Sequence, residues 1–230
     1  MIVGNGMLAR AFAPRFLRDP DVLVFASGVA NSTETDAHAF ERERALFERS
    51  AGRHAGRVVY FSTCAVAQPD APSTSYLRHK QAMEQRVLAL DGGIVLRLPQ
   101  VVGPSTNPHT LANFLADRIS RGERFTVWAR AERNLVDVED VARIAAEMIG
   151  QATPPTLLTI AGGESLPMPA LVGLFERVLG RPALYDAEDR GAPLPVDASV
   201  ALSIADRLSI DLGPGYAMRV VRRYYGGGAD

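Results

Sequence analysis

The chain has 230 residues, of which 47% are hydrophobic, and its 25 Lys and Arg against 26 Asp and Glu give a net charge of -1. This balance excludes a basic nucleic-acid-binding surface, and a single cysteine, Cys64, excludes a disulfide framework. We find no signal peptide and no run of eighteen apolar residues, so we expect a cytoplasmic protein that does not bind a membrane.

Short apolar segments alternate with amphipathic ones over the first 100 residues. Runs typical of strands buried on both faces cover residues 1–4, 22–26, 58–62 and 94–98. Hydrophobic residues recur with the spacing typical of amphipathic helices in residues 7–17, 37–50 and 76–90. The alternation predicts an α/β, Rossmann-like fold with a parallel sheet and right-handed crossovers.

The composition changes after about Gly150, where Pro and Gly surround one predicted strand and one predicted helix. We therefore expect a dinucleotide-binding domain with the catalytic residues over 1–150. A smaller C-terminal α/β lobe over 151–230 is expected to bind the substrate, with segments of the two parts interleaved. Near the C-terminus, Arg219, Arg222 and Arg223 have helical spacing and are expected to form the solvated face of a last helix.

The opening segment, MIVGNGMLAR, contains a possible phosphate-binding turn. Gly4, Gly6 and Ala9 fit the strand-turn-helix fingerprint, in which glycines allow a tight turn and close approach to a pyrophosphate. Backbone amides at the start of the helix would then face the phosphates. A structural glycine turn is the alternative. The next strand, VLVFASG, ends without the carboxylate that normally binds the adenosine ribose.

The segment SYLRHKQAMEQ places Tyr76 and Lys80 four residues apart on one helix face. An ammonium next to a phenol favours the phenolate and so lowers the pKa of a tyrosine that acts as acid or base. Lys80 would also bind the ribose of a nicotinamide, and Thr63, at the end of the preceding strand, would offer its hydroxyl to the substrate. A surface pair on a helix is the alternative for any single Tyr-x-x-x-Lys.

The order of these motifs resembles the extended short-chain dehydrogenases, the NAD-dependent epimerase/dehydratase family that acts on nucleotide sugars. The segments that carry the resemblance are IVGNGMLA, DVLVFASG, VVYFSTCAV, YLRHKQAME, IVLRLPQVVGP and RNLVDVEDVARI. It covers Met1 to about Ile149, with a looser similarity beyond. It implies that Thr63, Tyr76 and Lys80 are the catalytic set and that the cofactor is NAD or NADP.

The resemblance also implies binding residues. For the cofactor these are Gly4, Asn5, Gly6, Met7, Leu8, Phe25, Ala26, Ser27, Tyr76, Lys80, Pro99, Gln100 and Val101. For the nucleotide sugar they are Thr63, Cys64, Tyr76, Gln100, Asn107, Asn113 and Arg133, of which Arg133 corresponds to an arginine that binds the nucleotide-sugar phosphate. A homodimer paired through helices is the implied assembly.

The chain departs from the family in two places. Between Leu17 and Asp21 there is no room for the usual second and third strands, because a crossover needs about a dozen residues. We therefore expect a sheet ordered by residues 1–4, 22–26, 58–62 and 94–98, with the strand that carries the ribose acid missing. Relatives that dehydrate sugars have Asp-Glu after the catalytic Thr, whereas Cys64-Ala65 follows Thr63 here, which disfavours dehydration.

Two functions remain open. The first is an NAD(P)-dependent oxidoreductase or isomerase acting on a nucleotide sugar, by 4-epimerisation or by reduction of a 4-keto sugar. The second is a non-catalytic binding or regulatory protein that kept the fold. Cys64 is expected to be a small core or pocket-wall residue, and His79 to lie on the helix surface. No metal site is predicted, because His38, His54 and His109 lie in unrelated segments.

Overall fold

The computed structural model describes residues 1–68 and 73–227. Two compact units are formed, one of Met1–Leu98 with Val138–Ile160 and the other of Pro99–Asp137 with Ala161–Asp230. The chain therefore crosses between units three times, and residues 99–137, which the sequence analysis grouped with the dinucleotide-binding part, belong to the second unit. Within the described ranges, no helix is long and apolar enough to cross a membrane.

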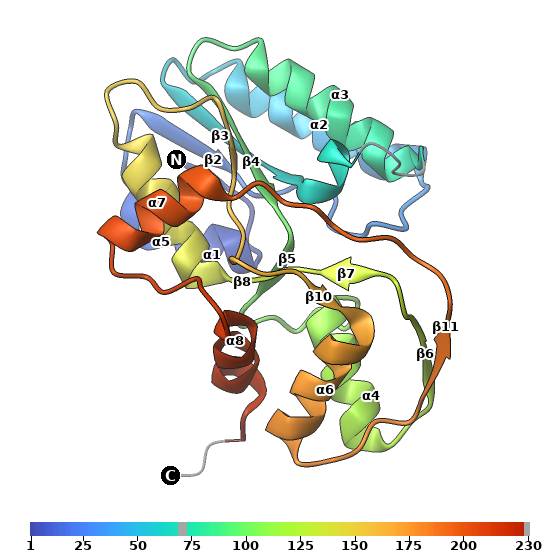
Figure 1. The fold of residues 1–230 in the computed structure, drawn as a ribbon. Coiled ribbons are helices and arrows are strands. Elements are labelled where there is room, and N and C mark those ends of the chain that lie inside the picture. The colour runs from blue at the N-terminus through green and yellow to red at the C-terminus, as the bar shows by residue number, and fades with distance from the viewer. Residues whose placement is uncertain (69–72, 228–230) are drawn as a thin grey trace. The chain divides into compact units, whose positions relative to one another are not determined.

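The first unit contains a five-stranded, all-parallel sheet (Figure 1). Its strands, in spatial order, are β1 (Ile2–Val3), β2 (Val22–Phe25), β3 (Arg57–Thr63), β4 (Gly93–Leu98) and β9 (Leu157–Thr159). The predicted order of the first four strands is confirmed, and β9 extends the sheet beyond β4. In the described part of the chain β1 pairs with β2 alone, so β1 is an edge strand.

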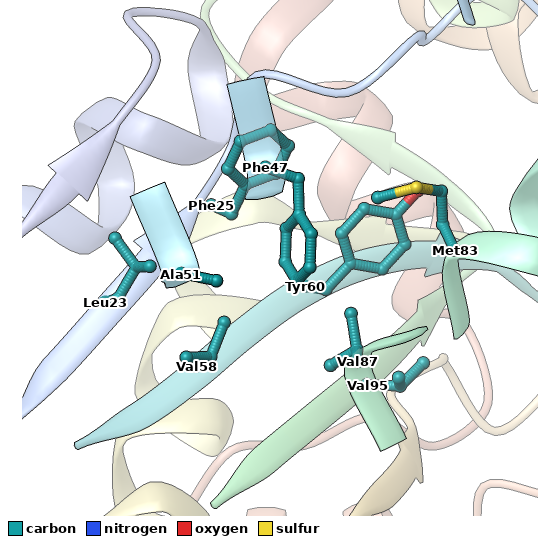
Figure 2. Packing of buried hydrophobic residues seen from close by; sticks show 9 residues of the cluster. All are labelled: Leu23, Phe25, Phe47, Ala51, Val58, Tyr60, Met83, Val87 and Val95. Carbon is teal, nitrogen blue, oxygen red and sulfur yellow. The ribbon is translucent and has the colours of Figure 1, made fainter. Parts of the chain in front are cut away.

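Helices cover both faces of this sheet, as a parallel sheet requires. On one face lie α2 (Ala37–Ala51) and α3 (Ser75–Leu88), and on the other lie α1 (Met7–Phe16) and α5 (Val138–Ile149) (Figure 1). Phe12 of α1 packs edge-on against Phe61 of β3, with ring centroids 5.0 Å apart. The α2–α3 face has an aromatic and aliphatic core, shown in Figure 2, made of Leu23, Phe25, Phe47, Ala51, Val58, Tyr60, Met83, Val87 and Val95.

Capping side chains mark the start of two helices of this unit. The side chain of Asp36 accepts a hydrogen bond from the His38 amide at the start of α2, and Thr74 accepts one from the Leu77 amide at the start of α3. By contrast, α1 has Gly6 at its N-cap position and no side-chain cap. The short 3-10 helix η1 (Cys64–Ala67) directly follows β3.

Among the residues that the structure describes, the second unit contains three strand pairs and four helices. The pairs are β5 (Gln100–Val102) with β8 (Leu135–Asp137) and β6 (Phe125–Trp128) with β11 (Tyr185–Glu188), both parallel, and β7 (Glu132–Arg133) with β10 (Leu166–Pro167), antiparallel. The helices are α4 (Leu111–Arg121), α6 (Met168–Leu179), α7 (Ser199–Arg207) and α8 (Tyr216–Tyr225).

Helix α8 is attached to β8 by a buried carboxylate. Asp137 is 2% exposed and accepts hydrogen bonds from the Arg223 guanidinium at 2.8 Å and from the Tyr224 hydroxyl at 2.9 Å. Arg219, Arg222 and Arg223 are exposed on α8, as expected, and Arg223 in addition reaches the buried Asp137. The physical reason is that a buried carboxylate needs charged or hydrogen-bonding partners, and the last helix supplies them.

Candidate active site

The turn between β1 and α1 uses its two glycines differently. Gly4 has φ +123°, and a Cβ there would lie 2.3 Å from the Ala26 carbonyl oxygen, so the approach of β2 requires glycine. Gly6 has an ordinary negative φ, and a Cβ there would meet no atom within 4 Å. The start of α1 has no side-chain cap and no acidic residue in its first turn, so its backbone N–H groups have the chemistry that binds an anion at a helix N-terminus.

The end of β2 offers no acid to a ribose. Phe25 is buried, Ala26 and Ser27 are half-buried, and the first acidic residue that follows is Glu34. The side chain of Glu34 accepts hydrogen bonds from the backbone N–H groups of Thr35 and Asp36. The turn therefore fits a pyrophosphate, while the strand end lacks the group that would bind the adenosine ribose.

Helix α3 brings the predicted tyrosine and lysine together. Tyr76 and Lys80 are both buried, and the Lys80 Nζ lies 5.8 Å from the centroid of the Tyr76 ring. Thr63 ends β3, and its hydroxyl oxygen caps η1 by accepting from the Ala65 amide at 3.3 Å. All three residues belong to the first unit.

The Lys80 ammonium is held by two groups that the sequence analysis did not identify. Its Nζ donates to the Tyr60 hydroxyl at 2.9 Å and to Glu43 Oε1 at 3.3 Å. The Tyr60 hydroxyl in turn donates to the same Glu43 oxygen at 2.6 Å. We refer to Glu43, Tyr60, His79 and Lys80 as the Glu43 cluster.

The second oxygen of Glu43 has partners as well. Its Oε2 accepts a hydrogen bond from the Val29 amide at 2.6 Å, and His79 Nε2 lies 2.9 Å from it. The His79 ring stacks on Phe40 with centroids 4.7 Å apart, and its side chain is 10% exposed. The expected surface position of His79 is therefore wrong, because Glu43 and Phe40 of α2 draw the ring into the space between the two helices.

The electrostatics of the cluster follow from burial and these contacts. Burial alone would raise the pKa of Glu43, but the contacts with His79, Lys80, Tyr60 and the Val29 amide lower it to about 2. Burial lowers the pKa of Lys80, which Glu43 opposes. Burial, followed by the charge of Glu43, raises the pKa of Tyr76 to about 12, opposite in direction to the effect expected from Lys80.

A second buried ion pair lies on the same helix. Glu84 of α3 accepts two hydrogen bonds from the Arg97 guanidinium of β4, at 2.9 and 2.6 Å. Burial raises the pKa of the nearby Cys64 thiol to about 12, although the charge of Arg97 acts in the opposite direction. A thiol in this environment is not a nucleophile at neutral pH, in agreement with the predicted role of Cys64 as a packing residue.

Several predicted binding residues belong to the second unit and already have backbone partners. The backbone N–H of Gln100 donates to the Asn134 carbonyl. Val101 pairs with Val136 in the β5–β8 ladder, which begins directly after Pro99. The Asn107 side chain accepts from the His109 amide.

Asn113 has a structural role in the second unit. Its Nδ2 donates to the carbonyls of Ser105 and Asn107, and its Oδ1 accepts from the Tyr225 hydroxyl at 2.6 Å. The side chain thus ties the segment before α4 to α8. Because both hydrogens of Nδ2 are used, a substrate acceptor could bind Asn113 only by displacing one of these bonds, whereas Oδ1 can still accept from a second donor.

Arg133, on β7, differs from the other half-buried ions. Its guanidinium donates to the Glu132 carbonyl at 2.7 Å, and in the described part of the chain no carboxylate lies within ion-pair distance of it. Burial lowers its pKa. A partly desolvated cation without a counterion is suited to binding an anionic ligand.

Residues 8–161, more than half of the chain, match the model of the NAD dependent epimerase/dehydratase family. The chain belongs to this family. No curated protein matches the sequence.

Solved structures with the same fold include UDP-glucuronic acid 4-epimerase from Bacillus cereus, with 14% identity and a TM-score of 0.71 over 92% of this chain and 76% of that one. UDP-glucose 4-epimerase from Thermus thermophilus has 18% identity and a TM-score of 0.68 over 97% and 83%. The dTDP-glucose 4,6-dehydratase from Bacillus anthracis has 12% identity and a TM-score of 0.68 over 97% and 78%. The predicted Rossmann-like fold is confirmed.

The sequence did contain a signal for the missed carboxylate. Ala39, Glu43, Phe47 and Ala51 follow one another at four-residue intervals along α2, and all four are buried. An acid at an apolar position of a helix needs a buried partner. The four-residue pattern alone would have identified Glu43, although not which cation it meets.

Proposed function

We propose that this family member is an NAD(P)-dependent enzyme that moves a hydride to or from a nucleotide sugar, as a 4-epimerase or a 4-keto-sugar reductase. The observation that carries the proposal is the buried pair of Tyr76 and Lys80 on one face of α3, in the same unit as an uncapped glycine turn. The chain that carries both features belongs to a family that is named for its NAD dependence.

The residues present fit the phosphate part of the cofactor better than its adenosine part. The uncapped start of α1 and the open space at Gly6 suit the pyrophosphate. At the end of β2 no carboxylate is available for the ribose. When bound, the dinucleotide would supply the hydride chemistry, and Lys80 and Tyr76 would hold its nicotinamide end.

Residues of the chain itself would transfer the proton and orient the reacting oxygen of the sugar. The Tyr76 hydroxyl would donate a proton to, or take one from, the sugar oxygen at the reacting carbon. The Thr63 hydroxyl would hydrogen-bond the same oxygen and orient it. Lys80, once its ammonium faces Tyr76 or the ribose, would stabilise the phenolate form.

Arg133 supports an anionic substrate. Its unpaired guanidinium can take two phosphate oxygens at once, which suits the diphosphate of a nucleotide sugar. Cys64 and Ala65 stand after Thr63 in place of the acidic pair of sugar dehydratases, so we favour epimerisation or reduction over dehydration. The homodimer implied by the family remains a prediction, testable by sedimentation.

Substitution of Tyr76 by Phe tests the proposal. The variant keeps the ring and should fold normally, but it lacks the hydroxyl, so turnover should fall by orders of magnitude. The measurement is steady-state kinetics with NAD and NADP against a panel of nucleotide sugars and their 4-keto forms. Calorimetric titration of the same sugars is the control and should give largely unchanged affinities, reduced at most by the loss of the one hydrogen bond of the Tyr76 hydroxyl. Near-native turnover of the variant would refute the role of Tyr76.

The second candidate is a binding or regulatory protein that does not turn over a sugar. It is favoured by the absence of a ribose acid and by the engagement of Lys80 with Glu43. The two candidates are separated by the same kinetic panel, because a binding protein would take up nucleotide sugar or dinucleotide without product formation.

A further inference from the structure

The buried ion pair of Glu43 and Lys80 suggests a second role for Glu43, which rests on the proposed function. We propose that Glu43 is a positioning residue: it fixes the Lys80 ammonium against Tyr60 and cancels its charge, so that Tyr76 stays a protonated phenol in the ligand-free protein. The site would thus begin its cycle with Tyr76 ready to donate a proton, as reduction of a keto sugar requires.

The geometry of the ammonium supports this role. Lys80 Nζ is bonded to Glu43 Oε1 and to the Tyr60 hydroxyl, and its side chain is 4% exposed. Each oxygen of Glu43 is bonded in turn, to the Tyr60 hydroxyl on one side and to the Val29 amide on the other. A carboxylate held at both oxygens cannot turn away, so the ammonium has a fixed counterion.

The cluster is sealed by the loop that follows β2. A Cβ at Gly28 would lie 2.9 Å from Lys80 Nζ and 3.0 Å from Glu43 Oε1, so the backbone of Gly28 packs directly on the ion pair. The predicted cofactor segment, Phe25 to Ser27, immediately precedes this glycine. A dinucleotide bound at this segment would therefore lie next to the ion pair of Glu43 and Lys80. Its ribose hydroxyls would compete with Glu43 for hydrogen bonds from the Lys80 ammonium.

The charges around Tyr76 agree with a neutral phenol. The titratable and charged groups of the packed elements that take part in these buried contacts are Glu43 of α2, Tyr60 of β3, Cys64 of η1, Arg97 of β4, and His79, Lys80 and Glu84 of α3. Glu84 is neutralised by Arg97 through two hydrogen bonds. Glu43 acts on Tyr76 in the direction that favours the phenol.

The test measures the ionisation of Tyr76 directly, without any ligand. Tyrosine labelled with ¹³C at Cζ is incorporated, and the Tyr76 signal is assigned by its loss in Tyr76→Phe. In Glu43→Gln the amide keeps the shape of the side chain but removes the charge, so the pKa of Tyr76 should fall by about one unit or more. The matched control is Glu84→Gln, which removes a different buried carboxylate from the same region and should leave the titration of Tyr76 unchanged.

An unchanged pKa of Tyr76 in Glu43→Gln, or an equal fall in Glu84→Gln, would overturn the proposal. If Glu43→Gln does not fold, the double variant Glu43→Gln/Lys80→Met removes both charges of the pair and leaves no buried ion unpaired, so the pKa of its Tyr76 should stay close to that of the unaltered protein. A shift of about one unit or more in the double variant, in either direction, would show that the two charges do not cancel at Tyr76 and would also overturn the proposal.

Failure of the proposed function would be visible separately. Calorimetric titration of the unaltered protein with NAD and NADP tests the dinucleotide site, whereas the Tyr76 titration uses the protein alone. Absence of dinucleotide binding with a lowered pKa in Glu43→Gln would refute the enzyme and leave the electrostatic role of Glu43 intact.

Discussion

Arg133 is distinguished from the buried ions of the first unit by its lack of a counterion. Lys80 is paired with Glu43, and Arg97 with Glu84. Leaving one member of such a buried pair without its partner costs roughly 3 to 5 kcal/mol, which explains why these ions occur in pairs. Arg133 is half-buried and donates only to a backbone carbonyl among the described residues. A half-buried cation without a counterion is better explained by the binding of an anionic ligand than by a contribution to the stability of the fold.

Substitution of Arg133 by Lys keeps the charge and removes the planar, two-pronged donor. We expect the affinity for nucleotide sugars to fall about tenfold, because a bidentate charged contact is replaced by a single point charge. Calorimetry with the sugar that binds best gives the measurement, and the affinity for the dinucleotide is the internal control. If both ligands weaken to the same extent, Arg133 belongs to a different part of the site.

At the scale of elements, the turn between β1 and α1 contains two glycines, of which the fold requires Gly4 but not Gly6. Gly4 is required by its positive φ and by the carbonyl of Ala26. Gly6 is in a conformation that any residue adopts, next to open space. A glycine that the backbone conformation does not require, at the start of a helix without a side-chain cap, is compatible with the proposed close approach of a pyrophosphate to the backbone.

Substitution of Gly6 by Ala should therefore separate stability from binding. Its effect on the free energy of unfolding should be below about 1 kcal/mol, as for an exposed N-cap change. Dinucleotide affinity should fall about tenfold or more, because the new methyl group occupies the space of the pyrophosphate. Gly4→Ala is the matched comparison and should lower the melting temperature strongly. Unchanged dinucleotide affinity in Gly6→Ala would show that no phosphate binds at this turn.

At the scale of the whole molecule, the sheet ends at β1. In the described ranges no further strand lies beyond it, and the carboxylate that would bind the adenosine ribose is absent from the end of β2. A cofactor would therefore be held by its pyrophosphate and nicotinamide parts. Each lost charge-assisted hydrogen bond is worth roughly 1.5 to 3 kcal/mol.

We therefore expect dinucleotide affinity to be ten- to a hundredfold weaker than a complete site would give, with dissociation constants in the micromolar range or above. Titration calorimetry with NAD and NADP, run together with sedimentation to establish the assembly, gives the measurement. Sub-micromolar binding by an isolated monomer would contradict this expectation.

The sequence, together with its family resemblance, determined the order of the first four strands and the positions of α1, α2 and α3. Apolar runs of four or five residues between amphipathic segments fit a buried parallel sheet and little else. The spacing of Tyr76 and Lys80 placed both on one helix face, and the three residues between Leu17 and Asp21 excluded two further strands. This spacing and this short connection are local features, so periodicity and chain length are sufficient to predict them.

The partners of Lys80 were decided only by the tertiary structure. Glu43 lies 37 residues before Lys80 on another helix, and Tyr60 lies on a strand between them, so no local pattern connects the three. Their contact arises because α2 and α3 pack side by side on the same face of the sheet (Figure 1). Packing also reversed the effect expected on the pKa of Tyr76, because burial of the phenol raises this pKa and the charge of Glu43 raises it further.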